Sequence, residues 1–426
     1  MGINTVSHIR LYRSVEEFNS AYTGDEYIEP WVSLCLENSG VSFNKTWYDK
    51  LIGVPLTFNI ISGGTIEYGL SNGNISYAKT IEYSVNGGEW TSFTPTENVR
   101  FVEIPVNAGD TIQFRGDNAG YSGEYEEEGE TYMYINCFLP GENNPPLYTI
   151  EGNIMSLVNS TGFSAVTELT QAFAFYNLFY NCETLISAKN LRLPATTLAN
   201  YCYESMFEYC TSLTTPPELP ATALTDGCYN SMFYNCTSLT TAPALPATAL
   251  TERCYGSMFS KCTSLVTAPS LPATTLANYC YQQMFNGCAS LTTVPADYLP
   301  ATTLATYCYQ GMFNGCTSLT TAPELPATTL TTYCYQNMFN GCTSLTTAPA
   351  LPATTLANYC YQQMFRNCTS LNYIKCLATN ISASNCTTNW VNGVAASGTF
   401  VKNPNMTGWT TSTSGIPSGW TVQDAS

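Results

Sequence analysis

Apolar and polar residues follow a pattern along residues 174–375 that returns about every 26 positions. In the first half of each unit, a Thr-rich stretch leads into two prolines, such as Pro243 and Pro246, which forbid a helix. We expect a short strand or extended turn there. In the second half, Leu224, Cys228, Met232 and Cys236 fall within about 120° of one another on a helical wheel. This spacing predicts a short helix with one apolar face.

Two cysteines mark every unit, eight positions apart. The first falls at residues 202, 228, 254, 280, 308, 334 and 360, and the spacing widens once, between Cys280 and Cys308. A degenerate copy precedes them, with Ala174 in place of the first cysteine and Cys182 as the second. Within a helix such a pair would lie about 12 Å apart, beyond the reach of a disulfide. Without CxxC spacing, and with a single histidine, metal binding is disfavoured, so we interpret these thiols as small buried apolar groups.

The flanking regions have other patterns. Residues 51–150 contain runs such as TIEYSVNGGEW and VRFVEIPVNAGD, which are typical of strands joined by turns and predict a β-sandwich. Residues 1–50 have no clear period and are expected to form an anchoring or docking segment. Residues 151–375 form the predicted solenoid of about eight repeats, and residues 376–426 an aromatic β cap that closes its end. The predicted fold class is therefore α+β, in several domains.

Composition narrows the range of functions. Charged residues make up 11% of the chain and the net charge is −17, which makes nucleic acid an improbable partner. No apolar run is long enough to span a bilayer, and the first residues lack the apolar segment of a signal peptide, so we expect no membrane insertion. The one histidine, His8, would have to serve any His-dependent mechanism alone. Glu103, Asp110 and Asp117, and the acidic run at 124–130, read as surface turn residues, so we expect no enzyme and no cofactor.

A binding surface is a more credible source of function. On the helical wheel, the residue before each first cysteine and the residue two after it point away from the apolar face. A tyrosine beside an amide offers a flat ring with hydrogen-bonding groups at its edge, suited to a glycan or a protein. The alternative is that the tyrosines only stack on one another, and a second candidate is the threonine ladder of the extended half, which includes Thr292 and Thr320. The candidate ligand-binding residues are Tyr201, Tyr279, Gln282, Tyr307, Gln310, Tyr333, Gln336, Tyr359 and Gln362.

The repeated unit resembles the BspA-like class of leucine-rich repeats, whose signature joins an aromatic residue to CxxL and a Pro-ended extended segment. Phe233, Cys236 and Leu239 carry that signature in one copy, and the match recurs over about residues 174–375. The resemblance implies a solenoid used for adhesion or recognition at bacterial surfaces, without catalysis. Two departures are a slightly longer unit and the absence of a recognisable secretion signal.

Residues 15–34 and 397–423 resemble the opening and ending of proteins from gut Bacteroidales and their tailed phages, crAss-like phages included. This resemblance implies a virion fibre or appendage protein that binds other virion proteins through its N-terminal region and a host glycan or protein through its repeats. It also implies a homo-oligomer, with a trimer as the usual state of fibres. The alternatives are a bacterial cell-surface adhesin, a structural capsid or tail decoration without ligand, and a glycan-cleaving enzyme that uses carboxylates.

Overall fold

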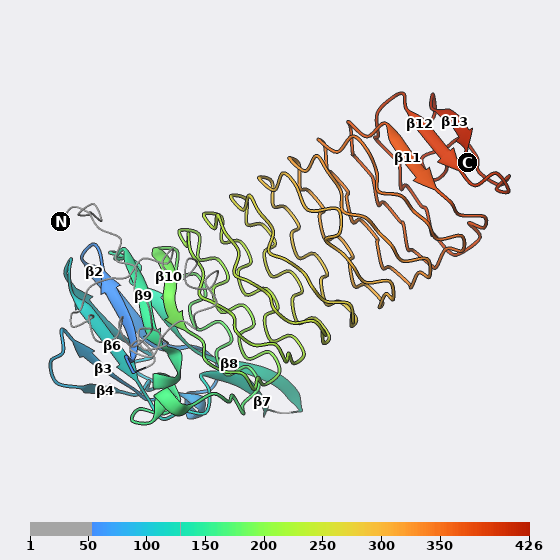
Figure 1. The fold of residues 1–426 in the computed structure, drawn as a ribbon. Coiled ribbons are helices and arrows are strands. Elements are labelled where there is room, and N and C mark those ends of the chain that lie inside the picture. The colour runs from blue at the N-terminus through green and yellow to red at the C-terminus, as the bar shows by residue number, and fades with distance from the viewer. Residues whose placement is uncertain (1–52, 128) are drawn as a thin grey trace, which may run out of the picture.

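The computed structural model describes residues 53–127 and 129–426, so the predicted anchoring segment and His8 lie outside the described residues. Figure 1 shows an elongated molecule with three parts in line: a domain of two sheets, a stack of coils and a small terminal sheet. The described part is built mostly of strands and turns, and its few helices are short 3-10 turns. None of these helices has the length and apolar character needed to cross a membrane.

The domain of two sheets, called here the two-sheet domain, begins with the first described residues. Its larger sheet has the order β10-β9-β1-β6-β3-β4 and its smaller sheet the order β5-β2-β8-β7. Neighbouring strands are antiparallel except for the pair β9 and β10. The strands are β1 (Leu56–Ile60), β2 (Gly64–Asn72), β3 (Ile81–Val85), β4 (Thr91–Phe93), β5 (Phe101–Val106), β6 (Thr111–Arg115), β7 (Ser122–Glu127), β8 (Glu130–Pro140), β9 (Tyr148–Asn153) and β10 (Leu185–Arg192).

Aromatic rings join the two sheets. Phe138 on β8 lies 5.1 Å from Phe58 on β1 and 4.7 Å from Phe114 on β6, measured between ring centroids. All three side chains are fully buried. Large rings bury much apolar area in one residue and pack well at tilted angles, so this layer stabilises the contact between the sheets.

The coils continue directly from this domain. β10, the extended segment of the first coil, pairs in parallel with β9 of the larger sheet. Phe179 of the same coil stacks on Phe138 of the domain at 5.6 Å and on Phe207 of the next coil at 5.3 Å. The domain therefore covers the first coil, whose apolar face would otherwise meet water.

The predicted helix of each unit is wrong. The segment from Tyr201 to Cys210 is a row of tight turns, and the same row recurs in every coil. Within it every fourth residue is left-handed, with φ of 57° at Tyr201, 52° at Ser205 and 62° at Tyr209. The apolar residues consequently recur with a period of four and not 3.6, and we call each such segment a turn row.

Backbone hydrogen bonds explain why turns replace a helix. In the turn row, alternate amides bond within the coil, such as Met206 N–H to the Tyr203 carbonyl at 3.3 Å. The amides between them bond to the next coil, such as Tyr203 N–H to the Cys228 carbonyl and Phe207 N–H to the Met232 carbonyl, both at 3.0 Å. A helix would use nearly all these amides internally and leave none to join the coils.

The other half of each unit is extended, as predicted. Isolated parallel bridges join threonines of successive coils, among them Thr241 to Thr267 and Thr267 to Thr293. Regular strands form only at the two ends of the array, in β10 and in β11 (Tyr373–Cys376). The coils thus share hydrogen bonds on two sides, which holds them in register along the axis.

The far end of the array is closed by large aromatic residues. Trp390 is fully buried, stacks on Trp409 at 5.5 Å and donates from Nε1 to the Gly415 carbonyl at 2.8 Å. β11, β12 (Thr399–Lys402) and β13 (Thr421–Asp424) form a parallel sheet over the last coil. A further turn row lies at residues 384–393, so the coil pattern runs past the predicted boundary at residue 375.

Candidate functional site: the outward columns of the repeat array

Four tyrosines form a stacked column on the outside of the turn rows. Tyr307 lies 4.6 Å from Tyr279 and 4.4 Å from Tyr333, and Tyr333 lies 4.4 Å from Tyr359, all nearly parallel. We call this set the tyrosine column. Each of its members has a left-handed backbone, held by the hydrogen bonds that join the coils. The ring faces therefore pack on one another, and only the edges and hydroxyls point to solvent.

A second column of side-chain amides runs beside the tyrosines. The amide of Gln282 donates to Gln310, which donates to Gln336, which donates to Gln362. We call these four residues the glutamine column. Sequence reasoning expected both columns to be exposed, but their side chains are half-buried. The structure thus brings eight of the nine predicted site residues together as two adjacent, internally bonded columns.

The ninth predicted residue, Tyr201, occupies the equivalent position in an earlier coil, but its neighbours are not tyrosines. It stacks on Phe173 at 4.8 Å, and Gly227 of the following coil leaves room for its ring. A Cβ at Gly227 would lie 2.1 Å from that ring. Next in line, the guanidinium of Arg253 lies 4.9 Å from the ring centroid of Tyr279. In three successive coils this position is therefore occupied by an aromatic ring (Tyr201), a glycine without a side chain (Gly227) and a cation (Arg253).

The amide column also changes at its beginning. Glu204 stands where later coils have glutamine and accepts a hydrogen bond from the Asn230 amide at 2.7 Å. Burial raises the pKa of the Glu204 carboxyl to about 7, against the lowering effect of that hydrogen bond. Nearby Glu208 raises this pKa further, whereas Arg253 lowers it. The amide column therefore begins with a carboxylate, where the later coils carry a neutral amide.

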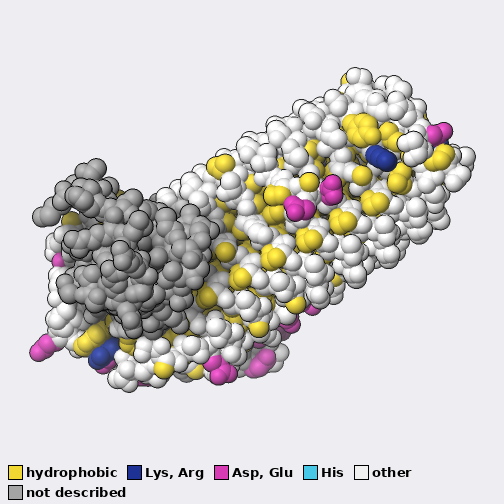
Figure 2. All heavy atoms as spheres, viewed as in Figure 1, with side chains coloured by type: hydrophobic (Ala, Val, Ile, Leu, Met, Phe, Trp, Pro, Cys, Tyr) yellow, Lys and Arg dark blue, Asp and Glu magenta, His cyan; other side chains and the backbone are white. Residues whose placement is uncertain are grey.

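A third outward feature was missed by sequence reasoning. Proline and alanine side chains follow one side of the coils, and Figure 2 shows hydrophobic rows along the array with few charged groups. Between two coils they line a groove of about 430 Å³ that includes Pro243, Pro246 and Pro272. The repeated APxLP motif was the available signal, because most copies expose a proline. The exposed prolines of the repeats are Pro220, Pro246, Pro272, Pro295, Pro300 and Pro326.

The repeated thiols point inward, and the prediction that they are buried is confirmed. The eighteen described cysteines are free and buried. The second thiol of a coil donates to a carbonyl of the preceding coil, as from Cys236 to Phe207 at 3.1 Å. Burial raises the pKa of Cys254 to about 12, so its thiolate is scarce at neutral pH. These cysteines therefore pack the interior of the array.

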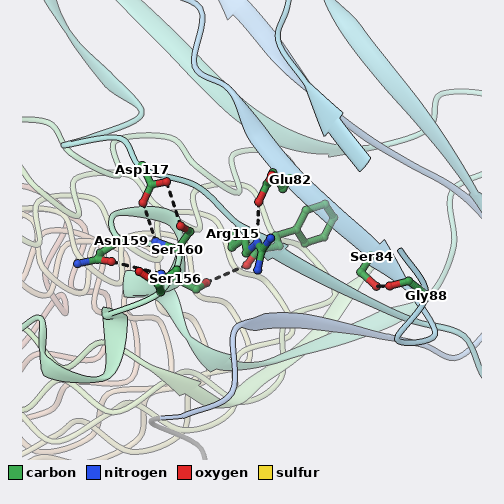
Figure 3. A network of polar contacts seen from close by, with 10 residues as sticks. Glu82, Ser84, Gly88, Arg115, Asp117, Ser156, Asn159 and Ser160 are labelled. Atoms are coloured by element: carbon green, nitrogen blue, oxygen red, sulfur yellow. Dashed lines mark hydrogen bonds and ion pairs between the residues drawn. The ribbon is translucent and has the colours of Figure 1, made fainter. Parts of the chain in front are cut away.

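Two of the three carboxylates considered for catalysis have hydrogen-bond partners. Figure 3 shows Asp117 accepting hydrogen bonds from the backbone N–H and the hydroxyl of Ser160, at 2.8 and 2.9 Å. Asp110 accepts from the Asn86 side chain at 2.8 Å and from the Asn107 backbone at 2.7 Å. Glu103 on β5 lies opposite Glu67 on β2. In residues 53–127 and 129–426, no group of three or more His, Cys, Asp and Glu side chains is arranged to hold a metal ion.

The repeats match a known family model. Six copies of the BspA type Leucine rich repeat region match residues 175–292 and 302–389, with the break at the widened coil. No curated protein matches the chain. This chain also matches the solved structure of a leucine-rich repeat protein from Bacteroides ovatus. The two sequences are 14% identical, the match covers 61% of this chain and 88% of that chain, and the TM-score is 0.19. Over these two segments, the repeats of this chain are similar to the BspA-type leucine-rich repeat family.

Proposed function

We propose that this chain is a non-enzymatic recognition protein whose repeat array binds an extended ligand at a cell surface. The observation that carries the proposal is the pair of adjacent columns, which present one tyrosine and one glutamine per coil over four successive coils. Such a surface suits a ligand that repeats its own groups along its length.

The chemistry of the columns favours a neutral, hydroxyl-rich ligand. Burial, together with the neighbouring phenols of Tyr307 and Tyr359, raises the pKa of Tyr333, so its hydroxyl stays neutral and donates a hydrogen bond. The amides of the glutamine column both donate and accept. Since the stacked ring faces are occupied, recognition uses ring edges and hydroxyls. A host glycan fits these groups best, and an extended polypeptide is the second ligand class.

The second part of the proposal concerns the cell or particle that carries the array. The two-sheet domain, as an antiparallel β-sandwich, would hold the array at a distance from its attachment point, and the N-terminal region would bind the carrier. The repeat family supports a bacterial cell surface, where the chain would act as an adhesin. The resemblance of residues 15–34 to phage proteins supports a virion fibre or appendage, with assembly as a homo-oligomer. Immunogold labelling of intact particles and of cells distinguishes these two locations.

The binding proposal is tested with the full chain on an array of bacterial surface glycans. A variant that combines Tyr279→Phe, Tyr307→Phe and Tyr333→Phe keeps the stacked rings and removes three hydroxyls. Because a neutral hydrogen bond contributes about 0.5–1.5 kcal/mol, we expect at least a tenfold loss of affinity. The matched control, Thr292→Ala with Thr320→Ala and Thr346→Ala on the extended side, should bind as the wild type does. Equal binding by the phenylalanine variant would exclude the tyrosine column as the binding site. If the wild type binds none of the glycans, a structural spacer without ligand is favoured.

A further inference from the structure

A second row of tyrosines lies in the two-sheet domain, apart from the repeat array. It follows β7 and β8, which form a hairpin at the end of the smaller sheet (Figure 1). Tyr77 stacks on Tyr134 at 4.8 Å and contacts Tyr125 at 4.7 Å, and Tyr125 stacks on Tyr132 at 5.6 Å. We call these four residues the hairpin tyrosines. Tyr134 at one end of the row is buried, whereas Tyr132 at the other end is 45% exposed, and this exposed end needs an explanation.

The two ends of this row differ. At the inner end, the ammonium of Lys79 lies 5.1 Å from the ring centroid of Tyr134, and the Gln171 amide donates to the Tyr134 hydroxyl at 2.7 Å. At the outer end, Tyr132 is 45% exposed and no described cation lies over it. The chain therefore uses a cation on one end of the row and leaves the other end open.

The charges beside the open end are unfavourable without a partner. Glu127 and Glu130 pair directly across the hairpin, next to the pair of Tyr125 and Tyr132 and on the same side of the sheet. Like charges directly opposite each other on a sheet are destabilising. Neither carboxylate forms an ion pair with a base in the described part of the chain. An arginine or lysine placed over Tyr132 would gain a cation–π contact and relieve this repulsion.

The backbone at the same place favours a polypeptide over a small amine. β7 is the last strand of its sheet, and no described strand pairs with its outer edge. The repeat array covers only the start of this edge, where the Gln171 amide donates to the Ser122 carbonyl at 2.8 Å. Glu124, Glu126 and Glu127 on β7 are exposed. An open edge of this kind accepts an extended segment by adding it as a further strand.

From these observations we propose that the β7–β8 hairpin is a docking site for an extended, basic segment of a partner protein, with an arginine or lysine over Tyr132 between Glu127 and Glu130. The proposal is independent of ligand binding by the repeat array. It assigns a role to the acidic run that sequence analysis treated as a solvated turn.

The test measures binding of labelled short peptides to the full chain by fluorescence anisotropy. One peptide alternates arginine with threonine, the second alternates glutamate with threonine, and free arginine serves as the small-cation probe. We expect the arginine peptide to bind, with an affinity that falls as salt rises, while the other two probes do not. Tyr132→Ala should weaken the arginine peptide about tenfold, and the double change Glu127→Gln with Glu130→Gln should weaken it and flatten its salt dependence.

Matched controls are Tyr180→Ala, which removes a similarly exposed tyrosine from the repeat array, and Glu97→Gln, which removes an exposed carboxylate elsewhere on the domain. Both should bind as the wild type does. If Tyr132→Ala fails to fold, as judged by near-UV circular dichroism, the double glutamine variant decides the question. Equal binding of the arginine and glutamate peptides, or unchanged binding by a folded Tyr132→Ala or by the double variant, would overturn the proposal.

Discussion

Replacing Glu204 with glutamine should stabilise the repeat array at high pH. Glu204 is half-buried in a column that later coils fill with glutamine, and its pKa is raised to about 7 mainly by burial. Because the folded chain holds this proton more tightly than the unfolded chain does, the contribution to stability is complete below the ordinary pKa of 4.5. It is lost as the pH rises through about 7.

The size of the effect follows from the shift. A rise from 4.5 to about 7 corresponds to about 3 kcal/mol at about 1.4 kcal/mol per pKa unit. Solvent reaches part of this side chain, so screening lowers our expectation to about 2 kcal/mol. Glu204→Gln removes the ionisation and keeps an acceptor for the Asn230 amide. The variant should therefore match the wild type near pH 4.5 and exceed its stability by about 2 kcal/mol near pH 8.

Urea unfolding of wild type and variant at both pH values gives the comparison, since the difference between the proteins cancels the titration of all other groups. The control is Glu324→Gln, which replaces an exposed glutamate on the extended side of a later coil and so measures the effect of the same substitution away from the buried column. A Glu204→Gln protein that is no more stable than the wild type at pH 8, or a difference that stays constant with pH, would refute the reasoning.

Three further predictions concern the packing of the array. Gly227→Ala should destabilise the array by about 2 kcal/mol more than Gly287→Ala does. Both positions have a left-handed backbone, but only a Cβ at position 227 would clash with the Tyr201 ring. Thermal unfolding compares the two variants, and equal losses of stability would contradict the geometry. Trp390→Ala should cost about 3–5 kcal/mol and loosen the last coils first, which hydrogen exchange would show as lost protection confined to that end. Of the 19 cysteines, at most the one outside the described residues should react with a thiol reagent near pH 8 in the native protein, while all should react after unfolding; rapid native reaction of several would contradict the buried packing.

Sequence reasoning succeeded where burial alone sets the pattern. The repeat length and the inward-facing thiols could be predicted because each coil must bury the same side chains against the next. The helix was a wrong inference because periods of 3.6 and four differ by only about 80° over eight residues. The signal that could have corrected it was the polar and Gly residues at a four-residue interval, such as Asn337 and Gly341, which are the left-handed positions.

The candidate site was harder to predict from the sequence. That one tyrosine and one glutamine of each coil face outward follows from the buried set, but their contacts depend on the register between coils. Hydrogen bonds that join the turn rows set this register, as between Tyr307 N–H and the Thr332 carbonyl. Only that register brings Tyr307 and Tyr333 to 4.4 Å and lets their rings cover each other. For the same reason, the two-sided contacts of Phe138 in the two-sheet domain had no counterpart in the local sequence pattern.

The left-handed position before each first cysteine has a consequence for how such a protein can evolve. Its conformation is imposed by backbone bonds to the flanking coils, so the side chain there is not needed to form the fold. Tyr201, Gly227, Arg253 and Tyr279 occupy this position in four successive coils. Mutation can therefore change what the array displays while the interior stays constant, provided that the side chains at this position in neighbouring coils fit together, as Gly227 fits the Tyr201 ring. A lineage could acquire new surface specificities by point substitution, with no change in the fold.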